Sequence, residues 1–373
     1  MSHMKIALLI DTLGSGGAQR QIVNLACGLT AKGIDCNLIY YHDNNHYKDI
    51  LEKYKVRTTL IQKRSRFDVL FFFKLRNLIL QGNYSLLYAY LFTPSYVGVV
   101  IKLLAFGKIK LIISERSYEG YTPALFKKMR ALYRWCNLIT ANSHAQVEIL
   151  KKLKPHLSNK IKYIPNSIDV EKFYREQVNT YPAQKLKILA VGRIEKNKNP
   201  LTLIKAIQLL KKTNDIDIEV NWAGAFHKNI ANNDYLEECN RLIDENNLMD
   251  SWHWLGEITD VKKLYEQTDV VYHGSFGEGF PNVICEGLSM SCLVVASNVY
   301  DHPYIIEHGV NGFLFDPSDF NELYKLLLEV TLLSKEEKSK ISKKARLTAE
   351  EKFSMVKVLE YNIETFGEVL TNK

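Results

Sequence analysis

One stretch of this chain reads Ser275-Phe276-Gly277-Glu278-Gly279-Phe280-Pro281-Asn282-Val283-Ile284-Cys285-Glu286-Gly287-Leu288. It follows an apolar segment at residues 269–273, which is typical of a buried strand. The glycines indicate a tight turn, and Pro281 suits the first turn of a helix. A helix N-terminus at this place favours an anionic ligand, because its backbone N–H groups have no partner within the helix. Glu278 in the turn and Glu286 in the helix can both face that ligand.

The two glutamates admit three interpretations. They can act as a general acid/base pair. They can instead bind a sugar, because a carboxylate accepts paired hydrogen bonds from vicinal hydroxyls. Alternatively, Glu278 is an ordinary turn residue and Glu286 is a helix residue favoured by the helix dipole. We favour the sugar-binding interpretation.

Outside this stretch, apolar strand patterns alternate with amphipathic helix patterns along the whole chain. This alternation predicts an α/β protein with two parallel sheets, each covered by helices on both faces. The pattern is lost at residues 169–185, so we predict a first Rossmann-like domain at 1–182 and a second at 183–354. Residues 355–373 are predicted to form a helix that returns to the first domain, and residues 1–4 resemble an expression-tag scar. The active site is expected in the cleft between the domains.

Two further turns follow predicted strands. Residues 14–17, Gly-Ser-Gly-Gly, are either a simple tight connection or a place where the backbone approaches a phosphate. Arg193 and Lys198 follow the first strand of the second domain, where they are either solvated or bound to a diphosphate. We find no Asp-x-Asp pair at a strand end that would hold a divalent metal, so no metal or cofactor is expected.

Composition excludes several classes of protein. The longest apolar run, residues 96–106, contains Lys102 and is too short to span a bilayer. The six cysteines show no C-x-x-C pair and are expected to be free thiols. Charge is unevenly divided: residues 1–182 carry 27 Lys and Arg against 12 Asp and Glu, and residues 183–373 carry 22 against 29. The basic half therefore predicts an anionic partner such as nucleic acid, a membrane surface or a phosphorylated lipid.

Four motifs in this order carry a resemblance to a known family. They are Gly16-Gly17-Ala18-Gln19-Arg20, Ile164-Pro165-Asn166-Ser167-Ile168-Asp169, Val191-Gly192-Arg193 with Lys198-Asn199-Pro200, and Glu278-Gly279-Phe280-Pro281 with Glu286-Gly287. Together they resemble the retaining GT-B glycosyltransferases of family 4, over nearly the whole chain. The resemblance implies the transfer of a sugar from a nucleotide diphosphate donor with retention of anomeric configuration.

The same resemblance implies roles for single residues. Arg193 and Lys198 would hold the diphosphate, and Glu286 the donor ribose. The donor sugar would meet Glu278 and the backbone of Phe280, Pro281, Asn282, Val283 and Ile284. The base pocket would include Leu255, Glu257 and Ile258, and Gly16 and Gly17 would approach from the facing domain. Relatives often place a histidine after the strand at residues 110–114, but this chain has Glu115-Arg116-Ser117-Tyr118. We therefore expect Arg116 or Glu115 to face the reacting centre, with Tyr118 on the acceptor side.

The first domain also interleaves cations with large apolar residues, at residues 63–76 and 126–135. These segments are either ordinary helices with solvated basic faces or helices that lie on an anionic membrane. We favour the membrane, with contacts from Lys127, Lys128, Arg130 and Arg134. Nucleic acid is not favoured, because no recognised binding module is present.

The sequence thus predicts an enzyme that moves a hexose or N-acetylhexosamine, from a donor that is UDP-linked by family likeness, to a glycan or lipid-linked acceptor in bacterial surface polysaccharide synthesis. Arg116, Arg193, Lys198 and Glu278 are its expected catalytic residues. It is expected in the cytoplasm, peripheral on the inner face of the membrane. The alternatives are a nucleotide-sugar epimerase on the same scaffold and a non-catalytic nucleotide-sugar or lipid-binding protein.

Overall fold

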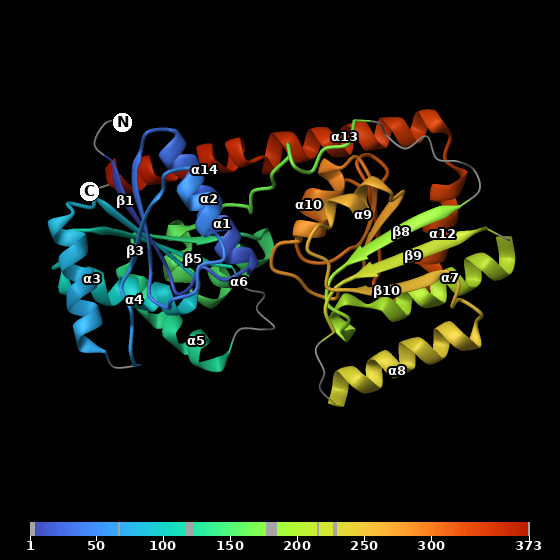
Figure 1. Ribbon diagram of the computed structural model, residues 1–373, viewed down its shortest axis with the longest axis horizontal. Helices are drawn as coiled ribbons and strands as arrows, with labels where there is room; N and C mark the ends of the chain where they lie inside the picture. Colours follow the sequence, from blue (N-terminus) through green and yellow to red (C-terminus); the bar gives the residue numbers. More distant parts are fainter. Residues whose placement is uncertain are drawn as a thin grey trace. The chain divides into compact units, whose positions relative to one another are not determined.

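The structure, a computed structural model, describes residues 4–65, 68–116, 123–176, 185–214, 216–226 and 230–371. It divides into two compact units, each built on a parallel sheet (Figure 1). Unit 1 comprises Met1–Ser167 and Met355–Lys373, and unit 2 comprises Ile168–Ser354. The division therefore falls at residue 167, earlier than the predicted boundary at residue 182.

Unit 1 holds a seven-stranded parallel sheet with the order β3-β2-β1-β4-β5-β6-β7. Its central strands are short and almost fully buried, as expected where both faces of a sheet are covered, whereas the edge strand at Arg57–Leu60 is largely exposed. The strands are β1 (Lys5–Ile10), β2 (Asp35–Tyr40), β3 (Arg57–Leu60), β4 (Leu86–Tyr90), β5 (Lys110–Glu115), β6 (Leu138–Ala141) and β7 (Ile161–Tyr163). The helices are α1 (Gly17–Ala31), α2 (Lys48–Lys53), α3 (Val69–Gln81), α4 (Phe92–Leu104), α5 (Ala124–Met129), α6 (His144–Leu153) and α14 (Met355–Thr371), with 3-10 turns η2 (Arg130–Trp135) and η3 (Pro155–Lys160).

The C-terminal helix α14 belongs to unit 1. Its side chains Leu359, Phe366 and Val369 join the buried cluster beneath α1 on one face of the sheet. Gly28 of α1 allows this approach, because a Cβ there would lie 2.9 Å from Leu359 Cδ2. Helices α3, α4 and α6 cover the opposite face.

Unit 2 holds a six-stranded parallel sheet with the order β10-β9-β8-β11-β12-β13. Helices α7, α8 and α12 cover one face, and α10 and α13 cover the other. The strands are β8 (Leu186–Val191), β9 (Ile218–Ala223), β10 (Trp252–Gly256), β11 (Val270–His273), β12 (Leu293–Ser297) and β13 (Phe313–Phe315). The helices are α7 (Pro200–Asn214), α8 (Ile230–Glu245), α9 (Lys262–Glu266), α10 (Asn282–Ser289), α11 (His302–Ile305), α12 (Phe320–Leu332) and α13 (Lys335–Phe353), with the 3-10 turn η4 (Lys196–Lys198).

Unit 2 begins at Ile168, and residues 169–176, where the sequence pattern is lost and a linker is expected, are a built part of this unit. The backbone N–H of Ile168 donates to the Phe353 carbonyl oxygen, and Phe173 joins the core beside α10 and α13. The Arg346 guanidinium also donates to the carbonyl oxygens of Val170 and Phe173. This segment is therefore fixed by packing, although its polar sequence resembles a connection.

The described helices contain no segment that is both long and apolar enough to cross a bilayer. The six cysteines, all of them within the described residues, are free thiols and buried.

Candidate active site

The residues predicted to bind the donor diphosphate gather at the topological switch point of unit 2. Strands β8 and β11 are neighbours in the sheet, and the chain leaves them toward opposite ends of the strand order. Open α/β sheets bind ligands at the carboxyl ends of strands at such a point. Arg193 and Lys198 follow β8, and Glu278 follows β11. The sheet thus brings these three predicted residues to one edge.

The turns after β8 and β11 are fastened to each other by backbone and amide hydrogen bonds. The Phe276 N–H donates to the Asn197 carbonyl oxygen at 2.9 Å, and Asn197 Nδ2 donates to the Gly277 carbonyl oxygen at 2.9 Å. The buried Tyr272 hydroxyl donates to the Asn199 carbonyl oxygen at 3.0 Å. These bonds hold the turn that carries Lys198 against the turn that carries Glu278.

Glu278 is the centre of a polar cluster. Lys198 Nζ forms an ion pair with its carboxylate, and Ser275 Oγ donates to Oε1 at 3.0 Å. His273 Nε2 lies 3.3 Å from the same oxygen. Burial acts to raise the pKa of Glu278, but the hydrogen bond from His273 and the charge of Lys198 outweigh it and hold that pKa well below its usual range. Glu278 is therefore ionised at neutral pH, which favours a role as hydrogen-bond acceptor over one as general acid.

Sequence reasoning missed two buried histidines beneath this cluster. His273 ends β11, and His302 begins α11, with their ring centroids 5.2 Å apart. His302 Nδ1 lies 2.6 Å from the Ser297 carbonyl oxygen, so Nδ1 carries the proton and donates. Its Nε2 is buried and has no hydrogen-bond partner among the described residues. Burial, reinforced by His273, lowers the pKa of His302 to about 3.

This environment predicts an acid-sensitive fold. Between the ordinary histidine pKa of 6.5 and the folded value of about 3, the unfolded chain binds a proton at His302 that the folded chain does not. Stability is therefore complete above pH 6.5 and falls as the pH drops, by about 2 kcal/mol between pH 7.5 and pH 5. Urea unfolding at these two values measures the difference. His302→Asn, which keeps a donor for Ser297, should show a smaller difference.

The pH range of this experiment separates His302 from its neighbour Glu278. The ordinary pKa of Glu278 is 4.5, so its stabilising ionisation is lost only below that value. Burial also lowers the pKa of His273, which contributes in the same direction as His302. His302→Asn should therefore reduce the pH dependence without abolishing it. An equal loss of stability in the variant and the wild type would contradict this assignment.

The helix predicted from Pro281 is α10, and Pro281 is its N-cap. Phe280 and Ile284 are buried in the core, so only their backbone atoms are available to a ligand. Asn282 and Val283 are half-buried at the start of the helix. Buried Glu286 accepts a hydrogen bond from the Tyr265 hydroxyl at 3.2 Å. Its predicted contact with a donor ribose stays a prediction.

The remaining predicted donor residues of unit 2 lie at other strand ends. Arg193 is exposed, and its guanidinium lies 3.3 Å from a carboxylate oxygen of Glu195. Leu255 is in β10, and Glu257 and Ile258 follow it directly. Strand β10 is the outermost strand of the sheet, two places from β8. Since the strands are parallel, this group and Arg193 both lie at the carboxyl ends of the strands.

In unit 1, Gly16 and Gly17 are exposed at the N-terminus of α1, at the end of the turn that follows β1. Arg116 follows β5 and is half-buried. Tyr118 lies outside the described residues. The structure thus places Gly16, Gly17 and Arg116 at the carboxyl edge of the unit 1 sheet.

Two predictions for unit 1 are wrong. Glu115 and Arg130, each 1% exposed, form a two-pronged ion pair with both N–O distances at 2.8 Å. Tyr133 and Gln146 donate further hydrogen bonds to the same carboxylate, at 2.6 and 2.8 Å. Glu115 therefore cannot face a reacting centre, and Arg130 cannot contact a membrane. By contrast, Lys127, Lys128 and Arg134 are exposed.

The sequence misplaced Arg130 because the helix does not continue as its pattern suggests. The segment forms α5 up to Met129 and then the 3-10 turn η2. A 3-10 turn has about three residues per turn rather than 3.6. Arg130 begins this turn and points inward to Glu115, and the change of period places Arg134, four residues later, on the outside.

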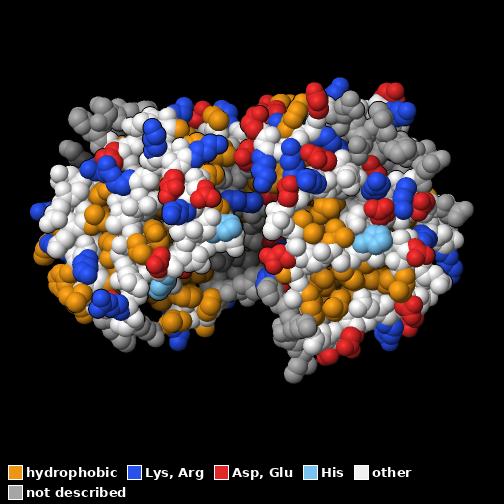
Figure 2. Space-filling model, viewed as in Figure 1, with side chains coloured by type: hydrophobic (Ala, Val, Ile, Leu, Met, Phe, Trp, Pro, Cys, Tyr) orange, Lys and Arg blue, Asp and Glu red, His pale blue; other side chains and the backbone are white. Residues whose placement is uncertain are grey.

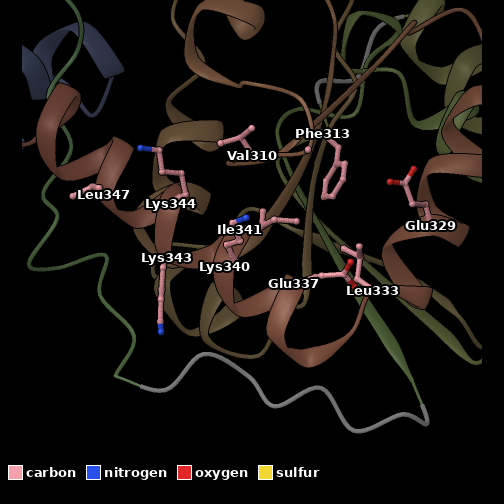
Figure 3. A pocket seen from close by; sticks show the side chains of 11 residues that line it. Val310, Phe313, Glu329, Leu333, Glu337, Lys340, Ile341, Lys343, Lys344 and Leu347 are labelled. Carbon is pink, nitrogen blue, oxygen red and sulfur yellow. The ribbon is translucent and has the colours of Figure 1, made fainter.

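A cavity of about 730 Å³ lies elsewhere on unit 2, between α12 and α13. Figure 3 shows Glu329 of α12 and Leu333, which directly follows α12, on one side, and Lys344 and Leu347 of α13 on the other. Phe313, at the amino end of β13, also lines it. None of the predicted donor residues lines this cavity, so we do not assign it to the donor.

Among the described residues, no group of three or more His, Cys, Asp or Glu side chains is arranged to hold a metal ion.

Two Rossmann-like units in one chain are the architecture of the GT-B glycosyltransferases. Cations and a carboxylate at the switch point of the second unit suit the donor site of such an enzyme. The family model for Glycosyltransferase Family 4 matches residues 15–172, and that for Glycosyl transferases group 1 matches residues 171–348. The chain therefore belongs to the glycosyltransferases that combine these two domains.

Relatives with known names support this assignment. The chain is 28% identical over 345 residues to GalNAc-alpha-(1->4)-GalNAc-alpha-(1->3)-diNAcBac-PP-undecaprenol alpha-1,4-N-acetyl-D-galactosaminyltransferase of Campylobacter jejuni, covering 87% of this chain and 88% of that enzyme. It is 26% identical to N-acetylgalactosamine-N,N'-diacetylbacillosaminyl-diphospho-undecaprenol 4-alpha-N-acetylgalactosaminyltransferase of the same organism, over 92% of this chain and 95% of the other. The fold is also that of Anabaena Alr3699/HepE in complex with UDP and glucose, with a TM-score of 0.80, 20% identity, and coverage of 98% and 100%.

Proposed function

We propose that the protein transfers a hexose or N-acetylhexosamine from a UDP-linked donor to a lipid-linked glycan acceptor in bacterial surface polysaccharide or glycolipid synthesis. The family assignment supports sugar transfer. Two relatives are named for transfer onto undecaprenol-linked sugars, and one structural neighbour is a complex with UDP. The observation that carries the proposal is the pairing of Lys198 with Glu278 at the switch point of unit 2.

In this proposal, binding of the donor separates Lys198 from Glu278. Lys198 leaves Glu278 and, with Arg193, holds the diphosphate, while the N-terminus of α10 stabilises the same charge without a metal ion. Glu278 then accepts hydrogen bonds from the hydroxyls of the donor sugar, and Glu286 from those of the ribose. His273 and Ser275 keep the Glu278 carboxylate in position when Lys198 turns to the phosphate.

We further propose that the reaction retains the anomeric configuration. The bond from the anomeric carbon to the phosphate oxygen breaks, and the acceptor oxygen bonds to the same face of that carbon. The acceptor proton passes to an oxygen of the departing diphosphate. Glu278 supports this route because His273 and Ser275 still hold its carboxylate after Lys198 has turned to the diphosphate, which makes it a poor nucleophile.

The test is to incubate UDP-sugars with and without polyprenyl-diphosphate-linked glycans and to measure free UDP and the configuration of the product. Acceptor-dependent UDP release with an α-linked product from an α-linked donor supports the proposal. A changed sugar on free nucleotide, without an acceptor, indicates an epimerase instead. Binding without either product indicates a non-catalytic protein.

We propose that unit 1 reaches this acceptor by docking on the anionic inner face of the cytoplasmic membrane. Exposed Leu125, Lys127 and Lys128 lie together on the short helix α5. Figure 2 shows hydrophobic side chains gathered over α3, with Lys and Arg side chains beside them. The exposed apolar side chains of α3 are Val69, Leu70 and Phe73. Apolar side chains that enter an interface beside cations on headgroups are typical of peripheral binding.

Charge reversal tests the docking. Lys127, Lys128 and Arg134 replaced by Glu should abolish flotation with vesicles of anionic lipid, because each cation near such a surface is worth about 1 kcal/mol. The matched control reverses Lys32, Lys53 and Lys152, which are exposed elsewhere on unit 1. Equal flotation of both triple variants would show that the membrane does not recognise α5.

A further inference from the structure

Arg116 is a cation whose hydrogen bonds, within the described residues, go only to neutral oxygens. Its Nε donates to Ser114 Oγ at 2.9 Å, Nη1 to Asn166 Oδ1 at 2.7 Å, and Nη2 to the Tyr90 hydroxyl at 3.1 Å. The guanidinium also lies over the Tyr90 ring, 4.2 Å from its centroid. Among the residues that the structure describes, no carboxylate pairs with it. The side chain is thus fixed in place, while no carboxylate of the described residues balances its charge.

A chain of buried amides supports this arrangement. Gln21 of α1 holds Ser167, accepting from its N–H at 2.7 Å and donating to its carbonyl oxygen at 2.9 Å. Ser167 follows Asn166, whose Oδ1 also accepts from Asn142 Nδ2 at 3.2 Å. Asn166 Oδ1, which accepts the hydrogen bond from Arg116, is therefore positioned by α1 and by the end of β6. An arginine that only covered the surface would need no such support.

The neighbouring residue gives a direct contrast. The negative charge of Glu115 is neutralised by its ion pair with Arg130, and Tyr133 and Gln146 donate further hydrogen bonds to it. Arg116, one position later, has no such carboxylate partner within the part of the chain that the structure describes. A half-buried cation loses hydration and recovers it best from an anion, and the planar guanidinium is suited to bind a pair of phosphate oxygens.

The position of Arg116 also fits a ligand. Tyr90 ends β4, and Arg116 follows β5, the next strand in the sheet. The switch point of unit 1 lies between β1 and β4, so Arg116 stands beside it at the carboxyl edge. The cavity that Arg116 shares with Gln21 and Asn362 measures about 20 Å³, enough for a single water. An anion must therefore reach the guanidinium from its exposed side.

The geometry points to Arg116 as the anion-binding residue of unit 1, with a phosphate group of a substrate as its ligand. This inference rests on the proposed function, which supplies two sources of phosphate: the diphosphate of the lipid-linked acceptor and that of the nucleotide donor. Arg116 would bind its phosphate through the N–H groups that Ser114, Asn166 and Tyr90 leave free. It takes no proton and forms no covalent bond.

Binding of inorganic pyrophosphate tests the anion site without any turnover. The full chain carries Lys198→Ala and Arg193→Ala in every sample, so that both predicted phosphate cations of unit 2 are removed. In this background Arg116→Gln should weaken pyrophosphate binding at least tenfold in calorimetry, and Arg116→Lys should weaken it less. The control is Arg76→Gln, because Arg76 is also half-buried and held by neutral oxygens but lies on helix α3. Unchanged affinity in a folded Arg116→Gln protein would overturn the inference.

Transfer assays then identify the source of the phosphate. If the acceptor supplies it, Arg116→Gln should raise KM for a lipid-diphosphate glycan tenfold or more and leave KM for the same glycan without phosphate unchanged. If the donor supplies it, both acceptors should lose activity equally and UDP should bind more weakly. Equal loss with unchanged UDP binding, or no loss at all, would refute phosphate binding. Should the wild type transfer no sugar, the proposed function fails, while the pyrophosphate measurement still decides the role of Arg116.

Discussion

Lys198→Ala is expected to reduce kcat about 10²–10³-fold, which is the effect of removing one group that stabilises charge developing in a transition state. Lys198 is the cation that the fold holds against Glu278, on a turn fastened to the Glu278 turn by two hydrogen bonds. In the proposed reaction the diphosphate gains negative charge as it departs, and Lys198 is placed to receive it. The loss should appear mainly in kcat, because the interaction strengthens as the bond breaks.

The matched control for this prediction is Lys196→Ala. Lys196 belongs to the same short turn, η4, but its side chain is exposed. Steady-state kinetics of both variants with the identified UDP-sugar, at saturating acceptor, separate a specific role from a general effect of positive charge. Wild-type kcat in a folded Lys198→Ala protein would remove Lys198 from the diphosphate site. A similar loss in both variants would show that only the net charge of the turn matters.

The stretch from Ser275 to Leu288 shows how far the sequence could predict this site. A strand, a glycine-rich turn and a helix with Pro281 at its start follow from local rules, and the structure has all three. The alternation of patterns likewise predicted two parallel sheets, and the order of strands then places Arg193, Lys198 and Glu278 at one edge. The pairing of Lys198 with Glu278 was not predicted, because the two residues are 80 positions apart and meet only through adjacent strands.

The two buried histidines and the inward position of Arg130 could not be predicted from sequence patterns. His273 and His302 lie within apolar surroundings without the spacing of a metal or catalytic motif, and only the packing of β11 and α11 brings their rings together. Arg130 was misread for the opposite reason, since its pattern indicated a surface helix. A local change from α-helix to a 3-10 turn decides whether Arg130 and Arg134 share a face, and short-range sequence patterns do not resolve such a change.

The buried pair of Glu115 and Arg130 leads to the second large effect, which concerns stability rather than turnover. Glu115→Ala should destabilise unit 1 by about 3–5 kcal/mol, because it leaves a buried guanidinium without its counter-charge. Arg130 is 1% exposed, so its guanidinium is not hydrated in the folded protein. Tyr133 and Gln146 would lose their acceptor in the same step. Hydrogen exchange of the β5 and β6 backbone measures the effect in unit 1, with the β11 backbone of unit 2 as an internal reference.

Replacing both Glu115 and Arg130 shows whether the instability arises from the unpaired charge of Arg130 or from the loss of the ion pair itself. If the cost arises from an unpaired buried charge, Glu115→Met combined with Arg130→Met should be less destabilising than Glu115→Ala alone, since apolar side chains of similar volume often replace a buried ion pair at little cost. Arg134→Ala should change exchange hardly at all, because Arg134 is exposed and stacks on the Trp135 ring, 4.1 Å from its centroid. A double variant as unstable as the single one would mean that the pair itself, with its four charged and polar contacts, specifies how η2 packs on the sheet. In that case Glu115 would be required for the fold on which the neighbouring Arg116 depends.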